Sequence, residues 1–181
     1  MAETIPVTSA QTEDLTAATQ AAIIQVCIAA HQEDDFKNLF TYVPSGGWHF
    51  LVYHNEELVS HAMVTTRWLQ PAGQPLLKTA YIDAVATLPK YQGRSFSSAL
   101  IRQLATEIDR EYVMGCLETE QETFYARLGW QTWRGSLAGR GEQGLIPTPD
   151  QRGIMILQLS QTPTLDLDSA LSIECQPDRI W

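Results

Sequence analysis

Two stretches of the chain repeat hydrophobic residues at the spacing of an amphipathic helix. The first follows an edge strand expected at residues 4–7, and Ser9 or Thr12 could cap its start, where two acidic side chains would complement the helix dipole. Its hydrophobic face consists of Leu15, Ala22, Ile23, Val26, Cys27 and Ala30. The second stretch begins after Gly93, and its face consists of Leu100, Ile101, Leu104 and Ile108. The pattern therefore predicts two helices that each bury one side.

Shorter stretches are rich in β-branched and aromatic residues, which is typical of strands. They cover residues 48–53, 58–68, 76–87, 113–117, 130–133 and 154–159. The first two should form a hairpin around residues 54–57, and a turn should follow at 70–74. Because the strands first follow one another and later alternate with helices, we expect one mixed α/β domain over residues 1–181.

The second half of the chain holds a further short helix and two segments without a periodic pattern. The helix is expected at residues 122–128 and should end at Gly129. Residues 135–150 are rich in glycine and proline and are expected to form a loop. Residues 163–181 are expected to be irregular.

The composition is that of an ordinary globular protein and limits the partners. Hydrophobic residues make up 44% of the 181 positions and charged residues 18%. No apolar run approaches the ~20 residues that cross a bilayer, and the N-terminus lacks a signal-peptide pattern, so we expect a cytoplasmic protein without a membrane partner. The formal charge of −9 argues against nucleic acid, which needs a basic face. The same charge would suit a cationic small molecule, or would serve solubility alone.

Neither the cysteines nor the histidines show the spacing of a metal site. Cys27, Cys116 and Cys175 lie far apart and are expected to be reduced and packed as small apolar side chains. The four histidines share no ligand spacing and are expected on the surface or packed in strands. The sequence therefore predicts no metal.

The most informative segment for chemistry is residues 85–100, VATLPKYQGRSFSSAL. A strand ends there, and a helix begins among small side chains. The first N–H groups of a helix lack intrahelical partners and carry positive potential, so a phosphate can bind them. Lys90 and Arg94 could add charge contacts. The segment matches neither the P-loop nor the Rossmann pattern, and taken alone, an ordinary helix cap at Ser95 or Ser97 explains it as well.

Two neighbouring features favour a phosphate site over an ordinary helix cap. Upstream, residues 81–87 (YIDAVAT) lead into the loop, and downstream, residues 122–130 (ETFYARLGW) place Tyr125 before a glycine. In this order the three pieces resemble the GNAT superfamily of acyl-CoA-dependent N-acetyltransferases. Its loop pattern, Q/R-x-x-G-x-G/A, resembles residues 92–97 (QGRSFS), where serine occupies the two positions that usually hold small residues. A serine is disfavoured where such a position needs a positive φ.

The resemblance implies a fold and a reaction. The expected fold is the GNAT fold, with a central mixed, mostly antiparallel sheet flanked by helices. The expected activity is transfer of an acetyl group from acetyl-CoA, as co-substrate, to a primary amine. GNAT relatives are often dimers, so a homodimer is an open expectation.

The chain also resembles one branch of the superfamily, the aminoglycoside 2′-N-acetyltransferases. Shared features follow the same order and spacing: Asp35-Phe36, residues 46–49 (GGWH), the segment from Tyr125 to Trp130, and a final Trp181. This branch implies an aminoglycoside or amino-sugar-like cation as acceptor, and antibiotic resistance as a consequence.

For acetyl-CoA, the resemblance implies contacts along the strand and the loop. Residues that would hold the pantetheine arm are Val85, Ala86 and Thr87, for which a plain central strand is the alternative. Residues that would hold the pyrophosphate are Gln92, Gly93, Arg94, Ser95, Phe96 and Ser97.

Two residues resemble the catalytic groups of the family. Tyr125 lies where the family has the tyrosine that protonates the coenzyme A thiolate, and a phenol is neutral at pH 7 and can donate. Its alternative is a packed aromatic beside Phe124 and Trp130. Asp83 lies where the branch has a carboxylate that accepts the amine proton through water, and a structural aspartate is the alternative. Strand alternation would place Asp83 on the same side as Val85.

The acceptor would be bound by acidic residues and the last tryptophan. On the resemblance, these are Asp35, with Asp34, Glu118 and Asp150 as further acidic candidates, and Trp181, which would help close the acceptor pocket. A disordered tail is the alternative for the last of these.

Three functions therefore remain open. The first is an acetyltransferase for aminoglycosides. The second is a GNAT enzyme for another small amine or a peptide amine. The third is a binding module that senses acyl-CoA without turnover. The serines in the loop favour the third slightly, while Asp83 and Tyr125 favour catalysis, because a sensor needs neither a proton donor nor an acceptor.

Overall fold

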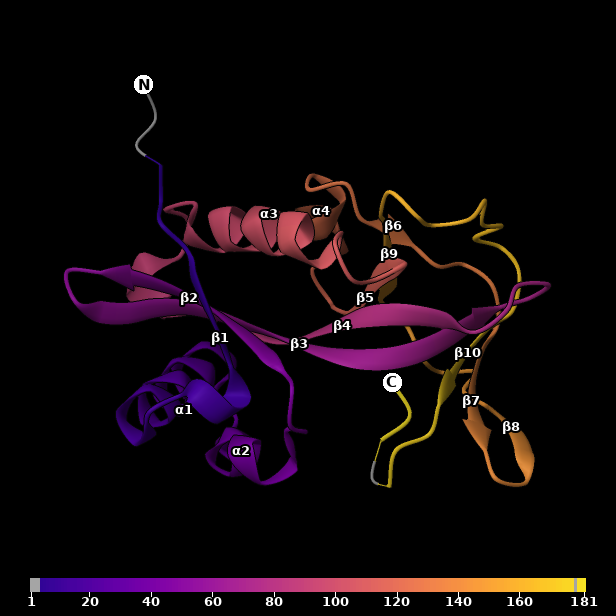
Figure 1. The fold of residues 1–181 in the computed structure, drawn as a ribbon, viewed down its shortest axis with the longest axis horizontal. Coiled ribbons are helices and arrows are strands. Elements are labelled where there is room, and N and C mark those ends of the chain that lie inside the picture. Colours follow the sequence, from indigo (N-terminus) through magenta and orange to yellow (C-terminus); the bar gives the residue numbers. More distant parts are fainter. Residues whose placement is uncertain (1–3, 178) are drawn as a thin grey trace. The chain divides into compact units, whose positions relative to one another are not determined.

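The computed structural model describes residues 4–177 and 179–181 (Figure 1). Its helices are η1 (Thr12–Asp14), α1 (Ala17–His31), η2 (Asp34–Asn38), α2 (Leu39–Tyr42), η3 (Pro89–Tyr91), α3 (Phe96–Ile108) and α4 (Glu122–Ala126). Its strands are β1 (Thr8–Gln11), β2 (Trp48–His54), β3 (Glu57–Pro71), β4 (Leu77–Thr87), β5 (Met114–Glu118), β6 (Gln131–Thr132), β7 (Leu137–Gly141), β8 (Gly144–Pro147), β9 (Ile154–Gln158) and β10 (Leu171–Glu174).

The sheet is mixed and mostly antiparallel, as the resemblance implied. Its strands follow the order β6-β9-β5-β4-β3-β10-β7-β8, and β2 pairs with both β3 and β1. β10 and β7 run parallel. The pairs β1–β2, β2–β3, β3–β10, β5–β9, β6–β9 and β7–β8 are antiparallel.

The described residues form two compact units. Unit 1 comprises residues 4–65 and 82–106, and unit 2 comprises residues 66–81, 107–177 and 179–181. The strands β3 and β4 each contribute to both units. The assignment of residues 1–181 to a single domain stays a prediction.

The core of unit 1 lies between α1 and the strands β2, β3 and β4. In Figure 1, α1 and α2 lie on one side of these strands and α3 lies on the other. Ile23, Val26 and Cys27 from α1 are fully buried, and they belong to one hydrophobic cluster with Ala84 and Ala86 from β4. The helical face predicted for α1 is thus the buried face, because its 3.6-residue spacing gathers these side chains on one side.

The predicted start of the chain is wrong by several residues. The edge strand is β1 at Thr8–Gln11 rather than residues 4–7, and it pairs with β2 from Thr8 opposite Leu51 to Gln11 opposite Trp48. The helix is capped by neither Ser9 nor Thr12: α1 begins later, and Thr16 Oγ1 accepts a hydrogen bond from the Thr19 amide at 3.1 Å. The backbone N–H of Thr12 instead donates to the Gly47 carbonyl at 2.8 Å.

The hairpin, the second helix and the short helix are confirmed. β2 and β3 are joined by Asn55 and Glu56, both with positive φ (50° and 65°), as a tight two-residue turn of type I′ requires. The predicted face of α3, at Leu100, Ile101, Leu104 and Ile108, is buried. α4 forms within the predicted range, and Gly129 follows it with φ +92°.

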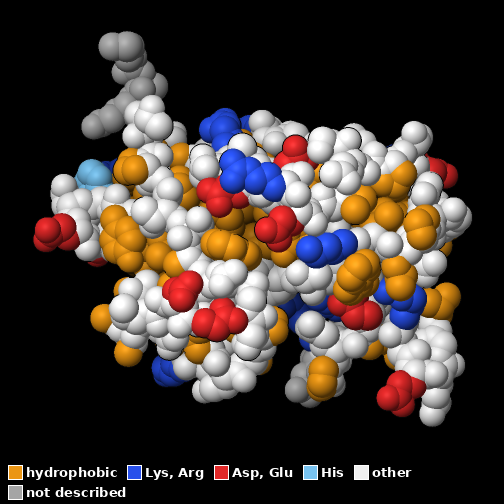
Figure 2. Space-filling view, in the orientation of Figure 1, with side chains coloured by type: hydrophobic (Ala, Val, Ile, Leu, Met, Phe, Trp, Pro, Cys, Tyr) orange, Lys and Arg blue, Asp and Glu red, His pale blue; other side chains and the backbone are white. Residues whose placement is uncertain are grey.

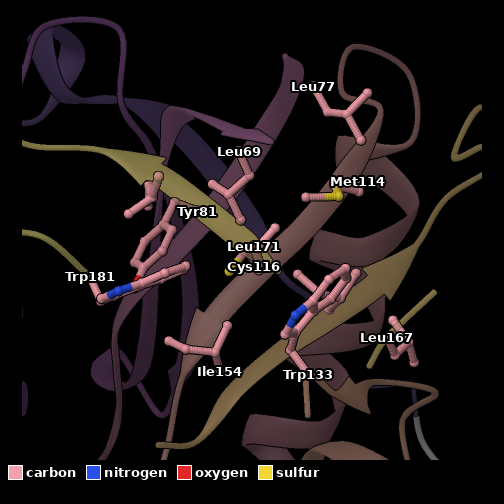
Figure 3. Packing of buried hydrophobic residues seen from close by; sticks show 12 residues of the cluster. Leu69, Leu77, Tyr81, Met114, Cys116, Trp133, Ile154, Leu167, Leu171 and Trp181 are labelled. Carbon is pink, nitrogen blue, oxygen red and sulfur yellow. The ribbon is translucent and has the colours of Figure 1, made fainter. Parts of the chain in front are cut away.

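The core of unit 2 is a cluster of aliphatic and aromatic side chains from several strands (Figure 3). Figure 3 shows the indole rings of Trp133 and Trp181 among these side chains. Trp181 is 5% exposed. Trp181 and the partly buried Ile180 therefore belong to a packed core.

Two segments expected to be irregular contain strands. Residues 135–150, predicted to be a loop, form the hairpin of β7 and β8, and residues 163–181 contain β10, which pairs with both β3 and β7. The glycines of β7 mark close packing rather than a loop. A Cβ on Gly139 would lie 2.6 Å from Cys175 Sγ and 2.8 Å from Ile180 Cγ2, so only glycine lets these segments meet.

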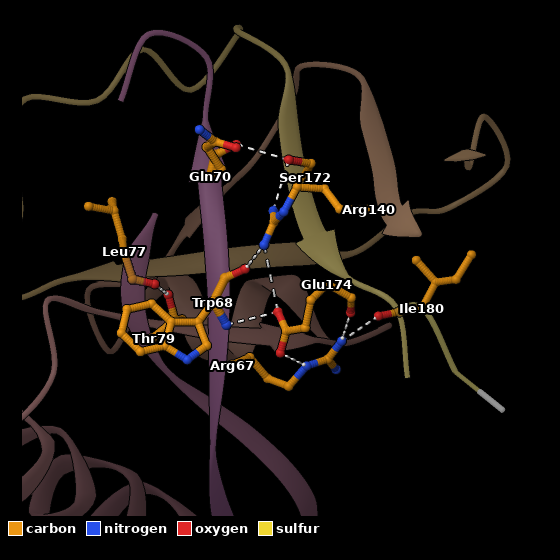
Figure 4. A network of polar contacts seen from close by, with 9 residues as sticks. All are labelled: Arg67, Trp68, Gln70, Leu77, Thr79, Arg140, Ser172, Glu174 and Ile180. Carbon is orange, nitrogen blue, oxygen red and sulfur yellow. Dashed lines mark hydrogen bonds and ion pairs between the residues drawn. The ribbon is translucent and has the colours of Figure 1, made fainter. Parts of the chain in front are cut away.

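Arg67 forms hydrogen bonds with Glu174 and Ile180, near the C-terminal end of unit 2 (Figure 4). Its side chain is 1% exposed, and its Nε donates to Glu174 Oε1 at 2.8 Å. Its terminal Nη2 donates to the carbonyls of Glu174 at 2.6 Å and Ile180 at 2.8 Å. The Trp68 amide donates to the other Glu174 oxygen at 2.8 Å. Because one buried guanidinium binds acceptors on both Glu174 and Ile180, it holds these two residues together.

Candidate active site

Side chains bind the backbone carbonyls of β4 over the segment Ala84–Thr87. The donors lie at hydrogen-bond distance from these oxygens: His61 Nδ1 to Ala84 O (2.9 Å), His31 Nε2 to Val85 O (3.0 Å), Ser60 Oγ to Ala86 O (3.1 Å) and Gln92 Nε2 to Thr87 O (3.2 Å). A backbone carbonyl must find a donor when water is excluded. These contacts fix the position of the strand expected to carry the pantetheine arm.

Asp83 and Ala84 form an irregular step in this strand. Ala84 has φ +48°, which is uncommon for a residue with a Cβ. Its N–H donates to Asp83 Oδ1 at 3.1 Å. Burial alternates along this segment. Asp83 and Val85 are half-buried, while Ala84 and Ala86 are buried and pack in the unit 1 core. The Asp83 side chain is thus held close to the strand backbone.

The loop after β4 turns into α3 through two residues with positive φ. Gly93 has φ +74° and Ser95 has φ +66°. The Ala99 amide donates to the Ser95 carbonyl at 2.9 Å, so Ser95 occupies the cap position of α3. A usual cap residue has an extended backbone, and Ser95 therefore carries a conformation that glycine would adopt more readily.

Ser97 lies inside the first turn of α3 and is not its cap. Its hydroxyl lies 2.6 Å from Thr87 Oγ1, which in turn lies 2.7 Å from Ser60 Oγ. The start of α3 is thus tied to the end of β4 and to β3. This chain of hydroxyl groups explains a serine at a position where the family pattern has glycine or alanine.

The two cations of the loop have different surroundings. Lys90 Nζ lies 2.9 Å from Glu57 Oε1, and the hydrogen bond from Lys90 lowers the pKa of Glu57 from its ordinary value. The Tyr91 hydroxyl donates to the other Glu57 oxygen at 2.9 Å. The Arg94 guanidinium lies 5.4 Å from the centroid of the Tyr91 ring. Lys90 is thus partnered by a carboxylate, and Arg94 rests on an aromatic face.

Phe96 anchors the start of α3. It is 8% exposed, and its ring centroid lies 5.5 Å from that of His54 and 5.9 Å from that of Tyr91. These aromatic contacts connect the loop to the β2–β3 hairpin. They give Phe96 a packing role beside the one expected in the phosphate loop.

Tyr125 lies in unit 2, on α4. It is 6% exposed, and its ring packs edge-on against Phe124 (5.0 Å between centroids) and Trp130 (5.9 Å). Burial raises the pKa of Tyr125 well above its ordinary value, so the phenol keeps its proton at pH 7. Within the described residues, the buried Trp130 Nε1 beside it has no hydrogen-bond partner.

The acidic acceptor candidates of unit 1 lie on η2. Asp34 and Asp35 are exposed there, and Asp34 pairs with Lys37 at 2.9 Å. Phe36, next to them, stacks on His31 with 5.0 Å between ring centroids. Because His31 also contacts the Val85 carbonyl, it links the acidic segment to β4.

The remaining acceptor candidates gather around one segment of unit 2. Gln151 Nε2 donates to Glu118 Oε1 at 2.7 Å, and Trp181 Nε1 donates to Thr148 Oγ1 at 3.0 Å. Asp150 is exposed and lies between these two contact points in the chain. Trp181 is buried, which argues against a disordered tail.

Sequence reasoning missed the histidines of unit 1. It expected surface or strand packing, and His49 and His61 do pack in strands. In addition, His61 bonds to the Ala84 carbonyl of β4, and His49 bonds to His61. Their alternation with apolar residues along two paired strands was the available signal. No group of three or more possible metal ligands occurs in the described part of the chain.

Charges of both signs are interspersed on the surface shown in Figure 2. No helix within the described residues is long and apolar enough to cross a membrane.

The fold and these elements correspond to a known family. Residues 7–133 match the model described as the acetyltransferase (GNAT) domain. The chain belongs to this family, and it is an acetyl-CoA-dependent N-acetyltransferase. It is 26% identical, over 91% of its length, to an aminoglycoside 2′-N-acetyltransferase from Mycolicibacterium fortuitum, of which the match covers 85%.

Solved structures agree with this fold. A GNAT family N-acetyltransferase (YhbS) from Escherichia coli in complex with CoA aligns with a TM-score of 0.65 at 10% identity, over 97% of this chain and 93% of that one. Eis1 from Mycobacterium abscessus aligns with a TM-score of 0.59 at 20% identity, over 74% of this chain. This chain spans only 32% of the Eis1 chain.

Proposed function

We propose that this enzyme moves an acetyl group from acetyl-CoA to a primary amine of an aminoglycoside or amino-sugar-like cation. The observation that carries this proposal is the strand–loop–helix segment from Val85 to Ser97, whose backbone turns at Gly93 and Ser95 directly before α3. The relative from M. fortuitum, named an aminoglycoside 2′-N-acetyltransferase, supports the choice of acceptor.

The loop suits a pyrophosphate. The backbone of Gly93 leaves open space, since an added Cβ would meet no atom within 4 Å. The first amides of α3 follow at once, and a helix of 13 residues adds positive potential at its start. Arg94 would add a cation, and Val85, Ala86 and Thr87 would offer backbone contacts to the pantetheine arm.

Asp83 and Tyr125 are assigned the two proton transfers. Asp83, half-buried on β4, would accept the proton of the acceptor ammonium through water. Tyr125 would donate its phenolic proton to the leaving thiolate. Burial raises the pKa of Tyr125, so the phenol is neutral at pH 7 and carries the proton that this role requires.

Acidic residues would bind the cationic acceptor. Asp35 is the first candidate, and Asp34, Glu118 and Asp150 are further ones, because exposed carboxylates concentrate cations near them. The Trp181 ring would contribute an apolar wall. Acetylation of an aminoglycoside would underlie antibiotic resistance.

A steady-state comparison of two tyrosine variants tests the catalytic assignment. Tyr125→Phe should lower kcat by about 10²-fold with little change in the KM for acetyl-CoA, because it removes only a general acid. Tyr53→Phe, at a tyrosine of β2 that is 40% exposed, is the matched control and should leave kcat unchanged. Full kcat in Tyr125→Phe would show that Tyr125 is not the acid.

A further inference from the structure

A chain of hydrogen bonds crosses the interior of unit 1 and ends on β4. His49 and His61 have no exposed surface. Thr12 Oγ1 lies 3.1 Å from His49 Nε2, His49 Nδ1 lies 3.0 Å from His61 Nε2, and His61 Nδ1 lies 2.9 Å from the Ala84 carbonyl. The two imidazole rings are stacked, with 5.3 Å between their centroids.

The proton arrangement between the Ala84 carbonyl and the His49 ring has one consistent solution. The Ala84 carbonyl can only accept, so His61 carries its proton on Nδ1. Burial lowers the pKa of His61 to about 3 and that of His49 to about 4, so both rings are neutral at pH 7. His61 Nε2 is then an acceptor and His49 donates to it from Nδ1, which leaves His49 Nε2 as an acceptor that faces the Thr12 hydroxyl.

The outer end of the chain is held by a close backbone contact. A Cβ on Gly47 would lie 2.9 Å from Thr12 Oγ1, so glycine lets the threonine approach. The Gly47 carbonyl still receives the Thr12 N–H at 2.8 Å. The Thr12 hydroxyl lies 3.1 Å from both the Gly47 carbonyl and His49 Nε2, so its single proton can go to either acceptor.

The inner end of this hydrogen-bond chain binds Ala84, a residue in an unfavourable backbone conformation. Ala84 has φ +48°, a left-handed conformation that is unfavourable for a residue with a Cβ. Its carbonyl is bound by His61 and its N–H by Asp83. Cys27 closes the remaining side, with Sγ 3.9 Å from the Ala84 carbonyl and 3.8 Å from His61 Nδ1.

We propose that His61, supported by His49, is a positioning residue for acetyl transfer: it holds Ala84 in the left-handed conformation and so sets the place of the Asp83 carboxylate. This inference rests on the proposed function, in which Asp83 accepts the amine proton. His61 itself is buried beneath the strand and acts through Ala84.

A second-site rescue separates this role from simple core packing. His61→Phe keeps a ring but removes the donor, and should lower kcat for a 2′-amino aminoglycoside by about tenfold or more, since small misplacements of catalytic groups are costly. Ala84→Gly should recover part of that loss in the double variant, because glycine adopts a positive φ without support. The same change at Ala62, buried in regular β3 opposite Phe50, is the control and should recover nothing.

The outcomes distinguish the two levels of inference. Should the wild-type enzyme acetylate no amine, the proposed function fails. If it is active but the double variant His61→Phe/Ala84→Gly is no faster than His61→Phe, or if His61→Phe keeps full kcat, the positioning role is wrong.

A spectroscopic measurement on the wild-type protein covers the case in which His61→Phe does not fold. Two-bond ¹H–¹⁵N spectra of the imidazoles at pH 7 should show His49 and His61 as neutral rings with the proton on Nδ1. A proton on Nε2 of His61, or a charged ring, would break the chain and overturn the inference.

Discussion

The hydroxyl groups of Thr87 and Ser97 lie 2.6 Å apart, and they join the end of β4 to the first turn of α3. This contact joins the strand assigned to the pantetheine arm to the segment assigned to the pyrophosphate of acetyl-CoA. It shows that the two serines of the loop are not equivalent. Ser97 has a regular helical position and a hydroxyl partner, while Ser95 has φ +66°.

The same substitution at these two serines should therefore change stability in opposite directions. Ser95→Gly should raise the free energy of unfolding by about 1 kcal/mol, because the folded backbone loses its strain. Ser97→Gly should lower it by about 1–2 kcal/mol, because glycine weakens a helix and the bond to Thr87 is lost. Urea unfolding of both variants checks this, and equal effects would contradict the assignment. Calorimetry should show undiminished acetyl-CoA binding by Ser95→Gly.

Two arginine ion pairs of unit 2 should differ greatly in how much they contribute to the free energy of unfolding. Arg67 is 1% exposed and bonds to Glu174 and two carbonyls, so Arg67→Met should cost about 3 kcal/mol or more by leaving buried acceptors unpaired. Arg134 pairs with Asp168 at 2.6 Å, yet both side chains are more than half exposed. Arg134→Met should cost less than about 1 kcal/mol. Urea unfolding compares the two, and similar losses would disprove a fastening role for Arg67.

Stability should fall as pH drops from 7 to 5. The pKa values of His49 and His61 in the folded state, about 4 and about 3, lie below the ordinary 6.5. The unfolded chain therefore binds protons first, so the folded state loses about 2 kcal/mol per histidine by pH 5. The loss begins near pH 6.5 and ends only below the folded pKa values. Unfolding free energies measured at pH 7, 6 and 5 check this trend.

A variant separates the histidines from other groups that take up protons. His49→Phe removes one titrating ring, so its loss of stability between pH 7 and pH 5 should be about half that of the wild type. An unchanged slope would mean that the buried histidines do not dominate in this range.

Patterns within single elements predicted most of the fold. The face of α3, the β2–β3 hairpin and the helix that carries Tyr125 follow from local periodicity and turn residues, so the sequence predicts them directly. β10 was missed because its four residues are too few to show a pattern, and it exists only through pairing with β3 and β7. Gly139 resembles a loop residue in the sequence, because its close neighbours, Cys175 and Ile180, are distant along the chain.

The site was predictable in part for the same reason. Its loop is contiguous in sequence, so residues 92–97 could be compared with a family pattern. The hydrogen bonds that hold β4 come from side chains on other elements, such as His31 and His61. No local sequence pattern predicts such contacts. Ser95 shows a mixed case: the sequence predicts that a positive φ would be costly there, and the structure shows that φ is positive.

The most direct measurement is coenzyme A release from acetyl-CoA over a panel of amines. The panel pairs aminoglycosides that bear a 2′-amine with analogues that lack it, and adds small primary amines and a peptide with a free N-terminus. The proposed function predicts rapid release with the 2′-amino compounds and little with the analogues. Equal rates for both groups, or turnover only with the peptide or small amines, would contradict the aminoglycoside assignment, and no release with any amine despite acetyl-CoA binding would indicate a sensor instead of an enzyme.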